Sequence, residues 1–599
     1  MHVVATAGHV DHGKSTLVRA LTGMEPDRWA EERRRGMTID LGFAWTTLSP
    51  GGRVAFVDVP GHERFVPNML AGVGPVPAAM VVVAADEGWM PQSAEHLAAL
   101  DALGVRHGLL VVSRADLADP GPAMRRAAEE LAATSLGSVE AVAVSAVTGA
   151  GMDELRAALS RLVTRLPAPA DGPVRLWIDR AFTIKGAGTV VTGTLGAGEL
   201  RTGDELELAG AARTVRVRGL QSLGEPVEVV RGPARVAVNL RGVDKDTVGR
   251  GAALLTPGRF LFTELVDVRV HGDPVADLPG TLTLHAGSAA VPVRVRPLGT
   301  DTARLRLARP LPLRIGDRAL LRDPGRHHVA GGVTVLDVVP PGLDRRGAAA
   351  ARAATLSGMD GVPDLADELR RRRLVRRDHL VRMGVPAAGD ALVRREDVTG
   401  MGVPAAGDAW LADPEHWADL GERLAAEVAA YARERPLEPG VPVEALRHRL
   451  DLPDRALVEA LVRPPLVLRS GRVSAGAAGV PQELVAAVEK AFAGLADRPF
   501  AAPEAYALAE LGLGPRQLGA AVRAGLVVQL ADNVVLRAGA PERAAEVLAG
   551  VPQPFTLSEA RRALDTTRRV AVPLLGLLDR TGATRRLPDD RRTVIDSGA

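Results

Sequence analysis

The chain has 599 residues, enough for four or more domains of ordinary size. It has no cysteine, which excludes disulfide bonds, thiol nucleophiles and zinc sites with cysteine ligands. Its formal net charge of +2 excludes a basic field over the whole molecule, so any nucleic-acid surface must be a local patch. The N-terminus shows no signal-peptide pattern and no apolar run is long enough to cross a bilayer, so we expect a cytoplasmic protein without a membrane partner.

The first motif lies between an apolar strand pattern at 3–7 and a helical pattern at 17–21, and it has the G-x-x-x-x-G-K-[ST] spacing of a phosphate-binding P-loop. Gly8 and Gly13 let backbone N–H groups point at phosphate oxygens, while Lys14 reaches the β- and γ-phosphates and the Ser15 hydroxyl binds Mg²⁺. A chance glycine turn is the alternative, but the flanking strand and helix argue against it. The predicted nucleoside triphosphate loop consists of Gly8, His9, Val10, Asp11, His12, Gly13, Lys14, Ser15 and Thr16.

The next two segments carry residues that a nucleotide switch requires. The charged segment 27–40 is typical of a solvated loop, but its place after a P-loop favours a switch segment in which Thr38 senses the γ-phosphate and Mg²⁺. A strand pattern ends in Asp58, which can hold Mg²⁺ through water, and Gly61 can donate its N–H to the γ-phosphate. His62 follows, and although a lone histidine after a strand is usually structural, we predict that it orients the attacking water as the catalytic residue.

Apolar strand patterns at 80–85, 108–112 and 141–144 alternate with helical patterns, which is typical of a parallel sheet covered by helices on both faces. In such a sheet the ligand binds at the carboxyl ends of the strands. The remaining candidates for nucleotide binding lie at those ends, and they are Ser113, Arg114, Asp116, Ser145 and Ala146. The sequence therefore predicts an α/β nucleotide domain at 1–166.

Helical periodicity nearly disappears after the Pro- and Ala-rich stretch that precedes residue 174. Short Val-, Leu- and Thr-rich runs separated by Gly predict two β-barrels, at 174–258 and 259–340. A flexible connector is expected at 341–362. Helices and hairpins, the latter at 466–473 and 526–536, then alternate about every sixty residues, as in winged-helix modules. We predict four such modules, at 363–412, 413–480, 481–540 and 541–599.

The last of these modules is rich in arginine at its predicted helix ends and wing. Such a cluster fits phosphate contacts at an RNA bend or loop, and a solvated basic face is the alternative. The arginines are Arg561, Arg562, Arg568, Arg569, Arg580, Arg585 and Arg586. The predicted fold class is thus multidomain, with an α/β P-loop domain, two β-barrels and four tandem winged-helix (α+β) modules.

The P-loop, R-G-M-T-I-D at 35–40, D-V-P-G-H at 58–62 and the segment D-E-G-W-M-P-Q-S-A-E-H at 86–96 resemble the G domain of translational GTPases of the elongation factor Tu class. The resemblance implies GTP and GDP as ligands, with Mg²⁺. In that family an N-K-x-D motif reads guanine; Asp116 matches its Asp, whereas Ser113 and Arg114 replace its Asn and Lys. We expect GTP selectivity to survive with altered affinity, because Arg114 can still lie against the base while Ser113 loses the amide hydrogen bonds that would brace the loop.

The stretches 179–193 and 239–243 resemble the second domain of selenocysteine-specific elongation factors. The resemblance implies that Asp179, Arg180 and Arg241 form a pocket for the aminoacyl end of the tRNA. Two guanidinium groups would favour selenocysteine, because its selenol is ionised at neutral pH while cysteine and serine are largely neutral. The alternative makes both arginines ordinary surface ion-pair partners. The last module resembles the family's final winged helix, which binds the hairpin in selenoprotein mRNA.

The resemblance as a whole implies a monomeric, GTP-dependent elongation factor. It would bind selenocysteinyl-tRNA and an mRNA hairpin and deliver the tRNA to the ribosome at UGA codons, with ribosome-stimulated hydrolysis of GTP to GDP and phosphate. Two other functions stay open from the residues: an RNA-binding initiation or ribosome-assembly GTPase, and a winged-helix DNA-binding regulator with a GTPase switch.

Overall fold

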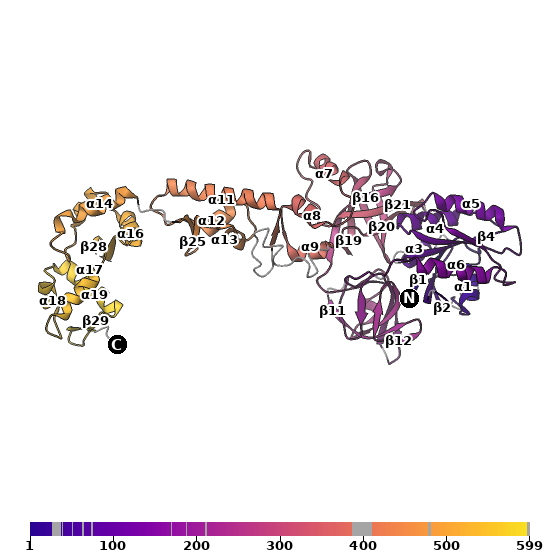
Figure 1. The fold of residues 1–599 in the computed structure, drawn as a ribbon, viewed down its shortest axis with the longest axis horizontal. Coiled ribbons are helices and arrows are strands. Elements are labelled where there is room, and N and C mark those ends of the chain that lie inside the picture. Colours follow the sequence, from indigo (N-terminus) through magenta and orange to yellow (C-terminus); the bar gives the residue numbers. More distant parts are fainter. Residues whose placement is uncertain are drawn as a thin grey trace. The chain divides into compact units, whose positions relative to one another are not determined.

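The computed structural model describes residues 1–26, 38, 40–50, 52–62, 65–73, 76–168, 170–186, 188–209, 213–326, 328–385, 410–476 and 481–595. Most of the predicted switch segment 27–40 lies outside these ranges, apart from Thr38 and Asp40. The chain forms two compact units, drawn in Figure 1. The first comprises Met1–Asp397 with Ala405–Leu411, and the second comprises Val398–Pro404 with Ala412–Ala599.

The first unit begins with a six-stranded sheet in the order β2-β3-β1-β4-β5-β6. β2 is antiparallel to β3 and the other neighbours are parallel, as the alternation of strands and helices predicts. The strands are β1 (His2–Ala7), β2 (Gly42–Leu48), β3 (Gly52–Asp58), β4 (Ala78–Ala84), β5 (His107–Ser113) and β6 (Glu140–Ala143). The helices are α1 (Lys14–Thr22), α3 (Val66–Val73), α4 (Pro91–Ala102), α5 (Pro120–Ala132) and α6 (Met152–Thr164).

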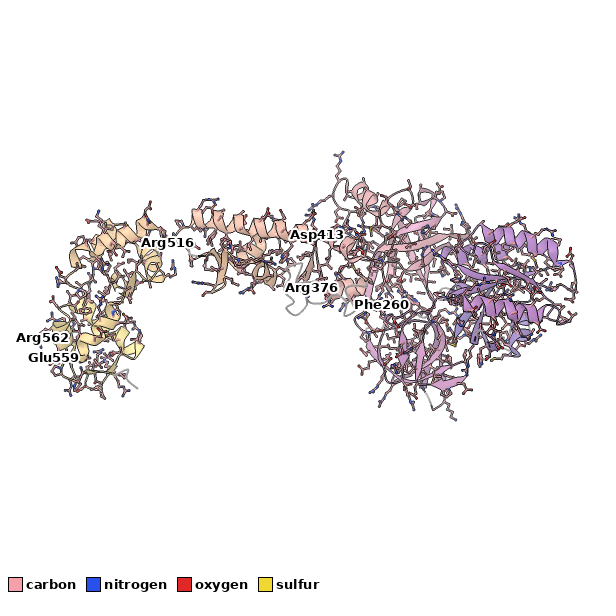
Figure 2. The ribbon with its side chains drawn as sticks, viewed as in Figure 1. Phe260, Arg376, Asp413, Arg516, Glu559 and Arg562 are labelled. Carbon is pink, nitrogen blue, oxygen red and sulfur yellow. The ribbon has the colours of Figure 1, made fainter. Side chains whose placement is uncertain are left out.

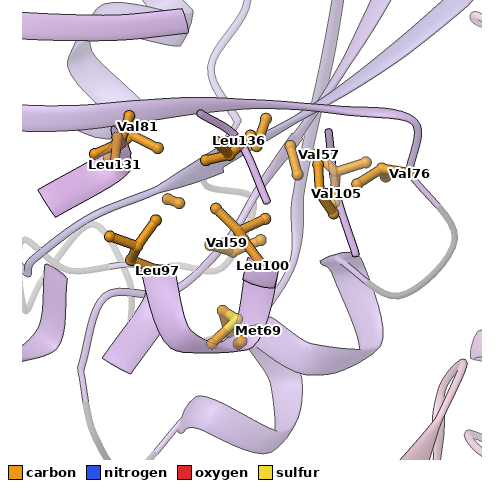
Figure 3. Packing of buried hydrophobic residues seen from close by; sticks show 14 of the residues in the cluster. Val57, Val59, Met69, Val76, Val81, Leu97, Leu100, Val105, Leu131 and Leu136 are labelled. Atoms are coloured by element: carbon orange, nitrogen blue, oxygen red, sulfur yellow. The ribbon is translucent and has the colours of Figure 1, made fainter. Parts of the chain in front are cut away.

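Helices cover both faces of this sheet, which explains the continuous apolar strands. Every residue of β4 is buried. One core lies between the sheet and helices α3, α4 and α5, and Figure 3 shows Leu100 of α4 beside Val59. The other core lies under α1 and α6. Burial on both faces leaves the carboxyl edge of the sheet as the place where polar side chains gather.

Two antiparallel β-barrels follow, as predicted. The strands of the first are β7 (Arg175–Ile184), β8 (Gly188–Leu195), β9 (Glu199–Arg201), β10 (Glu205–Leu208), β11 (Arg213–Ser222), β12 (Glu225–Val227), β13 (Val229–Arg231), β14 (Ala234–Arg241) and β15 (Ala253–Leu255). The second closes in the order β16-β19-β18-β17-β20-β21. Its strands are β16 (Leu261–Gly272), β17 (Thr281–Ala286), β18 (Ala289–Pro297), β19 (Thr302–Leu313), β20 (Arg318–Asp323) and β21 (His328–Asp337).

The predicted flexible connector at 341–362 is wrong, because this segment contains a docked helix, α7 (Ala348–Ser357). Arg352 of α7 is 7% exposed, and its guanidinium binds Asp267 at 2.7 Å and Asp337 at 2.6 Å, both on the second barrel. Leu356 packs against Leu336 of the same barrel. The ion pairs of Arg352 and the packing of Leu356 hold this Ala- and Arg-rich segment against the second barrel. Composition alone does not reveal these contacts.

The elements after α7 stay with the first unit up to residue 385. They are α8 (Leu365–Arg372), β22 (Leu374–Arg376) and α9 (Arg377–Met383), and β22 pairs with β23 (Trp410–Ala412). Arg372 of α8 binds Asp337 at 2.5 Å and Glu368 at 2.7 Å. Figure 2 labels Arg376, whose guanidinium lies 5.1 Å from the centre of the Trp410 ring. Part of the first predicted winged-helix module, 386–409, lies outside the described residues.

The second unit repeats the order of helices followed by a hairpin. The first group is α11 (Pro414–Glu434), β24 (Val441–Pro442), α12 (Val443–Arg449), α13 (Arg455–Leu461), β25 (Leu466–Arg469) and β26 (Arg472–Ala475). The second is α14 (Gln482–Phe492), α15 (Ala505–Glu510), α16 (Pro515–Arg523), β27 (Val527–Ala531) and β28 (Val534–Arg537). The third is α17 (Ala540–Ala549), α18 (Leu557–Ala563), α19 (Arg568–Thr581), β29 (Thr584–Arg586) and β30 (Arg592–Val594).

Both predicted hairpins are confirmed, with β25 paired to β26 and β27 paired to β28. The last two groups share one hydrophobic core, in which Phe500 and Leu536 pack with Leu574 and Leu578 of α19. The count of four winged-helix modules stays a prediction. Among the described helices, none has the length and apolar character needed to span a membrane.

The docking of α7 can be tested by limited proteolysis with thermolysin. Replacing Arg352 by Ala leaves the carboxylates of Asp267 and Asp337 buried with one partner fewer, which typically costs about 3–5 kcal/mol. We expect the Arg352→Ala variant to be cleaved within 341–362 much faster than the wild type. Arg346→Ala is the matched control, because Arg346 is exposed in the same segment. Equal cleavage of all three proteins would contradict the docking.

Candidate functional site

The phosphate loop lies between β1 and α1, and it is closed around the ammonium group of Lys14. Lys14 Nζ donates to the carbonyl oxygens of Gly8 at 3.0 Å and His9 at 2.6 Å. Gly8 has a φ of 135°, and a Cβ there would lie 2.2 Å from the carbonyl oxygen of Val82. Gly13, with a φ of 77°, caps α1. Both glycines thus occupy backbone conformations that other residues rarely adopt, as the motif requires.

The residues predicted to hold Mg²⁺ and the γ-phosphate lie beside this loop. Ser15 Oγ is 2.9 Å from Thr38 Oγ1. Asp58 is fully buried at the end of β3, where its Oδ1 accepts a hydrogen bond from Thr6 Oγ1 at 2.7 Å. A Cβ on Gly61 would lie 2.5 Å from Lys14 Nζ, so only glycine fits at that distance from the loop. Hydroxyl and carboxylate oxygens are donors that suit a hard cation such as Mg²⁺.

A hollow of about 780 Å³ extends from the phosphate loop to the predicted base-binding residues. The predicted residues that line it are Val10, Asp11, Gly13, Lys14, Ser15, Thr16, Thr38, Gly61, Ser113, Arg114, Asp116 and Ala146. Leu117 and Val147 add apolar walls near Asp116. Ser145 is buried behind the hollow, and its Oγ accepts a hydrogen bond from the backbone N–H of Thr148 at 3.1 Å. The structure therefore gathers the loop and base residues around one cleft.

The expected loss of bracing at Ser113 is wrong in part. Ser113 Oγ donates to the carbonyl oxygen of His12 at 2.7 Å, so one hydrogen bond still joins the end of β5 to the phosphate loop. Arg114, which has a φ of 54°, binds Asp86 at 3.0 Å and Glu87 at 2.8 Å and donates to the carbonyl oxygen of Asp11. The serine and arginine that replace Asn and Lys thus fasten the loop with a different set of bonds.

Three histidines lie in or behind the phosphate loop, and burial keeps them neutral. Desolvation lowers the pKa of His12 to about 4 and the pKa of His96 to about 3, and it also lowers the pKa of His9. Neutral imidazoles add no charge to a site built for phosphate. The predicted catalytic His62 is partly buried, and the centre of its ring lies 5.9 Å from that of Phe65. His62 is not among the residues that line the cleft.

The predicted aminoacyl pocket contains Asp179 and Arg180, but a different second arginine. Asp179 lies in a bulge of β7, is 3% exposed, and binds the guanidinium of Arg235 on β14. Arg180 Nε donates to Asp40 Oδ2 at 2.9 Å. The guanidinium groups of Arg180 and Arg235 lie 5.1 and 3.8 Å from the centre of the Phe43 ring. Arg180, Arg235 and Phe43 line a cavity of about 170 Å³.

Arg241 does not join this pocket, which corrects the prediction. It lies six residues beyond Arg235 on β14, roughly 20 Å along an extended strand. Arg241 instead lines a separate hollow of about 560 Å³ with Arg218 and Lys245. The sequence does not indicate Arg235, because this residue comes close to Asp179 only when three strands pair. β14 places Arg235 opposite Thr194 of β8, and β8 in turn pairs with β7, which carries the bulge at Asp179. No local pattern distinguishes it from the other arginines of the barrel.

The seven predicted RNA-binding arginines are all exposed. A hollow of about 500 Å³ on the last group of elements is lined by Thr556, Ser558, Arg561 and Arg568 together with 589–591. Figure 2 labels Glu559 and Arg562, which lie on α18. Among the described residues, Arg569 forms an ion pair with Glu504 and Arg586 forms one with Asp590.

The fold and the cleft define a P-loop nucleotide-binding protein joined to two β-barrels, and family models agree. Residues 1–165 match the elongation factor Tu GTP binding domain. Residues 274–342 match the beta-barrel domain of the selenocysteine-specific elongation factor, and residues 546–593 match the winged helix of elongation factor SelB.

Curated relatives agree with these matches. The selenocysteine-specific elongation factor of Desulfomicrobium baculatum is 37% identical over 387 residues, which cover 61% of each chain. That of Escherichia coli (strain K12) is 40% identical over 57% of this chain and 56% of its own length. Elongation factor Tu 2 of Streptomyces avermitilis is 33% identical over 56% of this chain and 96% of its own length. The chain belongs to the translational GTPases of the elongation factor Tu class, and its similarity to selenocysteine-specific elongation factors extends into the second barrel and the last group of elements.

The alignments span less than two thirds of the length of the two selenocysteine-specific relatives. A crystal structure of a bacterial selenocysteine-specific elongation factor, EF-Sec, matches with a TM-score of 0.73 over 99% of this chain and 100% of that chain. At 24% sequence identity, this match shows that the fold is shared.

The Ser113 brace can be tested by nucleotide binding. Ser113→Ala removes the hydrogen bond to the His12 carbonyl, which is worth about 1 kcal/mol, so we expect the affinity for a fluorescent GDP analogue to fall roughly fivefold. Ser93→Ala is the matched control, because the Ser93 hydroxyl is buried without a hydrogen-bond partner in the part of the chain that the structure describes. Equal affinity of the Ser113→Ala and Ser93→Ala variants would show that the brace does not support binding.

Proposed function

We propose that this chain carries selenocysteinyl-tRNA to the ribosome at UGA codons, is guided there by an mRNA hairpin, and hydrolyses GTP when it engages the ribosome. The observation that carries the proposal is the cluster of Asp179, Arg180 and Arg235 on the first barrel, which contacts the nucleotide domain at Asp40 and Phe43. Family membership supports GTP as the nucleotide, and Asp116 in the cleft is the residue expected to read guanine.

Hydrolysis would use the residues around the phosphate loop. Lys14 would bind the β- and γ-phosphates, and the N–H of Gly61 would bind the γ-phosphate. Ser15, Thr38 and, through water, Asp58 would hold Mg²⁺, which when bound neutralises charge on the phosphates. His62 would orient the attacking water. The contacts of Ser15 with Thr38 and the close approach of Gly61 to Lys14 support this arrangement.

The arginine pocket would recognise selenocysteine by charge. A selenolate is an anion at neutral pH, so two guanidinium groups in a largely buried site favour it over the neutral side chains of serine and cysteine. Arg180 and Arg235 have exposed side-chain fractions of 20% and 11%, so a bound anion would be poorly screened by water. Asp179 would orient Arg235 through their ion pair.

Competition between tRNAs tests this pocket. With GTP present, we expect the wild type to bind selenocysteinyl-tRNA at least tenfold more tightly than seryl-tRNA, since one pair with a charged group is worth about 1.5–3 kcal/mol. Arg180→Ala and Arg235→Ala should lose most of this preference. Arg241→Ala should keep it, because Arg241 lines a different hollow.

GDP binding by each variant reports whether the protein is folded. Equal wild-type affinity for the two tRNAs would reject the proposed function. A preference that depends on Arg241 and not on Arg235 would reject the pocket and restore the assignment made from sequence.

The arginines of the last module would bind the phosphate backbone of an RNA hairpin. We expect Arg561→Ala with Arg568→Ala, in the full chain, to weaken hairpin binding and to reduce the slope of log affinity against log salt by about 2, because each arginine would neutralise one phosphate. Arg543→Ala is the matched control, because Arg543 is exposed on α17 outside the cluster. Binding to duplex DNA as tight as to the hairpin would favour the DNA-binding regulator instead.

A further inference from the structure

Helix α4 carries three polar side chains whose contacts the proposed function does not use. The helix begins at Pro91 and includes the end of the segment 86–96 that resembles translational GTPases. Gln92 and His96 are four residues apart and therefore lie on one face, while Glu95 lies next to them. Each of the three makes a polar contact with another part of the first unit.

The first contacts reach the phosphate loop from behind. The backbone N–H of Gly8 donates to His96 Nδ1 at 3.0 Å, and the N–H of Val10 lies 3.4 Å from Gln92 Oε1. His96 is 1% exposed, and the bond from Gly8 requires that its proton sit on Nε2. That Nε2 is buried without a hydrogen-bond partner among the described residues. Burying the Nε2–H group without a partner is unfavourable, and an apolar side chain at this position would avoid that cost. The presence of a histidine is therefore best explained by the hydrogen bond that its Nδ1 accepts from Gly8.

Gly8, whose N–H is held by His96, also carries the carbonyl oxygen that the lysine of the loop contacts. Gly8 donates its N–H to His96 and accepts Lys14 Nζ on its carbonyl oxygen at 3.0 Å. Gly8 has a φ of 135° and no side chain that could anchor it, so its two peptide groups depend on hydrogen bonds such as the one to His96 for their orientation. Rotation of Gly8 in the absence of the His96 bond would move the carbonyl group that Lys14 contacts. His96 is thus linked to the phosphate-binding lysine through a single residue, Gly8.

The second barrel also holds α4. Arg322 of β20, 7% exposed, lies 3.4 Å from Glu95. α4 packs against β20 and β21, and a Cβ on Gly332 of β21 would lie 2.3 Å from the carbonyl oxygen of Ala102. In the core of the nucleotide domain, Leu97 and Leu100 hold the helix against the sheet (Figure 3). The helix therefore has little freedom to shift between the barrel and the loop.

We propose that α4 is a strut that sets the phosphate loop: His96 and Gln92 are positioning residues for nucleotide binding, and the second barrel holds the strut through Arg322 and Glu95. This inference rests on the proposed binding of guanine nucleotide. It makes the lifetime of bound nucleotide depend on a barrel from which no described residue lines the cleft.

The loop side of the strut is tested by two substitutions at His96 in the full chain, with the dissociation rate of a fluorescent GDP analogue as the readout. His96→Phe keeps a ring of similar size but removes the acceptor, so we expect dissociation about tenfold faster. His96→Asn places Oδ1 where Nδ1 was and should stay within about threefold of the wild type. Ser93→Ala, at a buried hydroxyl one turn away on α4, should match the wild type.

Thermal unfolding without nucleotide separates positioning from folding. A His96→Phe variant that unfolds at a lower temperature but releases GDP at the wild-type rate would overturn the proposal, as would equal impairment of the Phe and Asn variants. The failures are distinguishable, because a wild-type chain that binds no GDP overturns the proposed function together with this inference. Wild-type binding with an unchanged His96→Phe rate overturns the inference alone.

The barrel side is tested by Arg322→Met, which removes the contact with Glu95 and keeps an apolar stem. We expect GDP dissociation about threefold faster than in the wild type. Adding Arg322→Met to His96→Phe should change the His96→Phe rate little, because both substitutions act through α4. Arg326→Met is the matched control, since Arg326 is 76% exposed in the turn after β20. An unchanged rate for Arg322→Met, or effects that simply multiply in the double variant, would overturn the link to the barrel.

Discussion

The carboxylate of Asp40 joins the two sites of the first unit. It binds Arg180 at 2.9 Å and Arg250 at 2.6 Å, and both arginines belong to the first barrel. Burial opposes ionisation of Asp40, but the two arginines outweigh it and hold the pKa of Asp40 below its usual value. Two residues earlier, Thr38 contacts Ser15 of the phosphate loop. A short stretch of backbone thus connects the nucleotide cleft to the arginines of the proposed pocket.

Buried ion pairs join the second barrel to the helices that follow it. Asp267 and Asp337 bind Arg304, Arg352 and Arg372, so the second barrel, α7 and α8 are joined through shared carboxylates. Such groups stabilise a structure only when every charge keeps its partners, because an unpaired buried charge is strongly unfavourable. Since the arginines come from three separate elements, displacement of one would leave buried carboxylates underbonded.

The nucleotide cleft keeps its geometry with a changed set of contacts. Ser113 uses its hydroxyl where the family has an amide, and Arg114 is held by Asp86, Glu87 and the carbonyl oxygen of Asp11. Buried histidines hold backbone groups of the same region without adding charge, because desolvation keeps their pKa values low. The loop is therefore supported on its inner side by neutral groups and on its outer side by an ion-pair cluster.

The sequence by itself determined the phosphate loop, the order of strands and helices in the nucleotide domain, the two barrels and the hairpins at 466–473 and 526–536. These features follow from local spacing. Gly8, Gly13 and Lys14 belong to one short loop, and the periodicity of apolar residues indicates which faces of a strand or helix are buried. Only the tertiary structure decided that Arg235 and not Arg241 lies beside Asp179, that α7 is docked, and that Ser113 reaches His12. Each of these contacts joins residues on different elements, and their pairing depends on strand register and long-range packing, which no neighbouring residues encode.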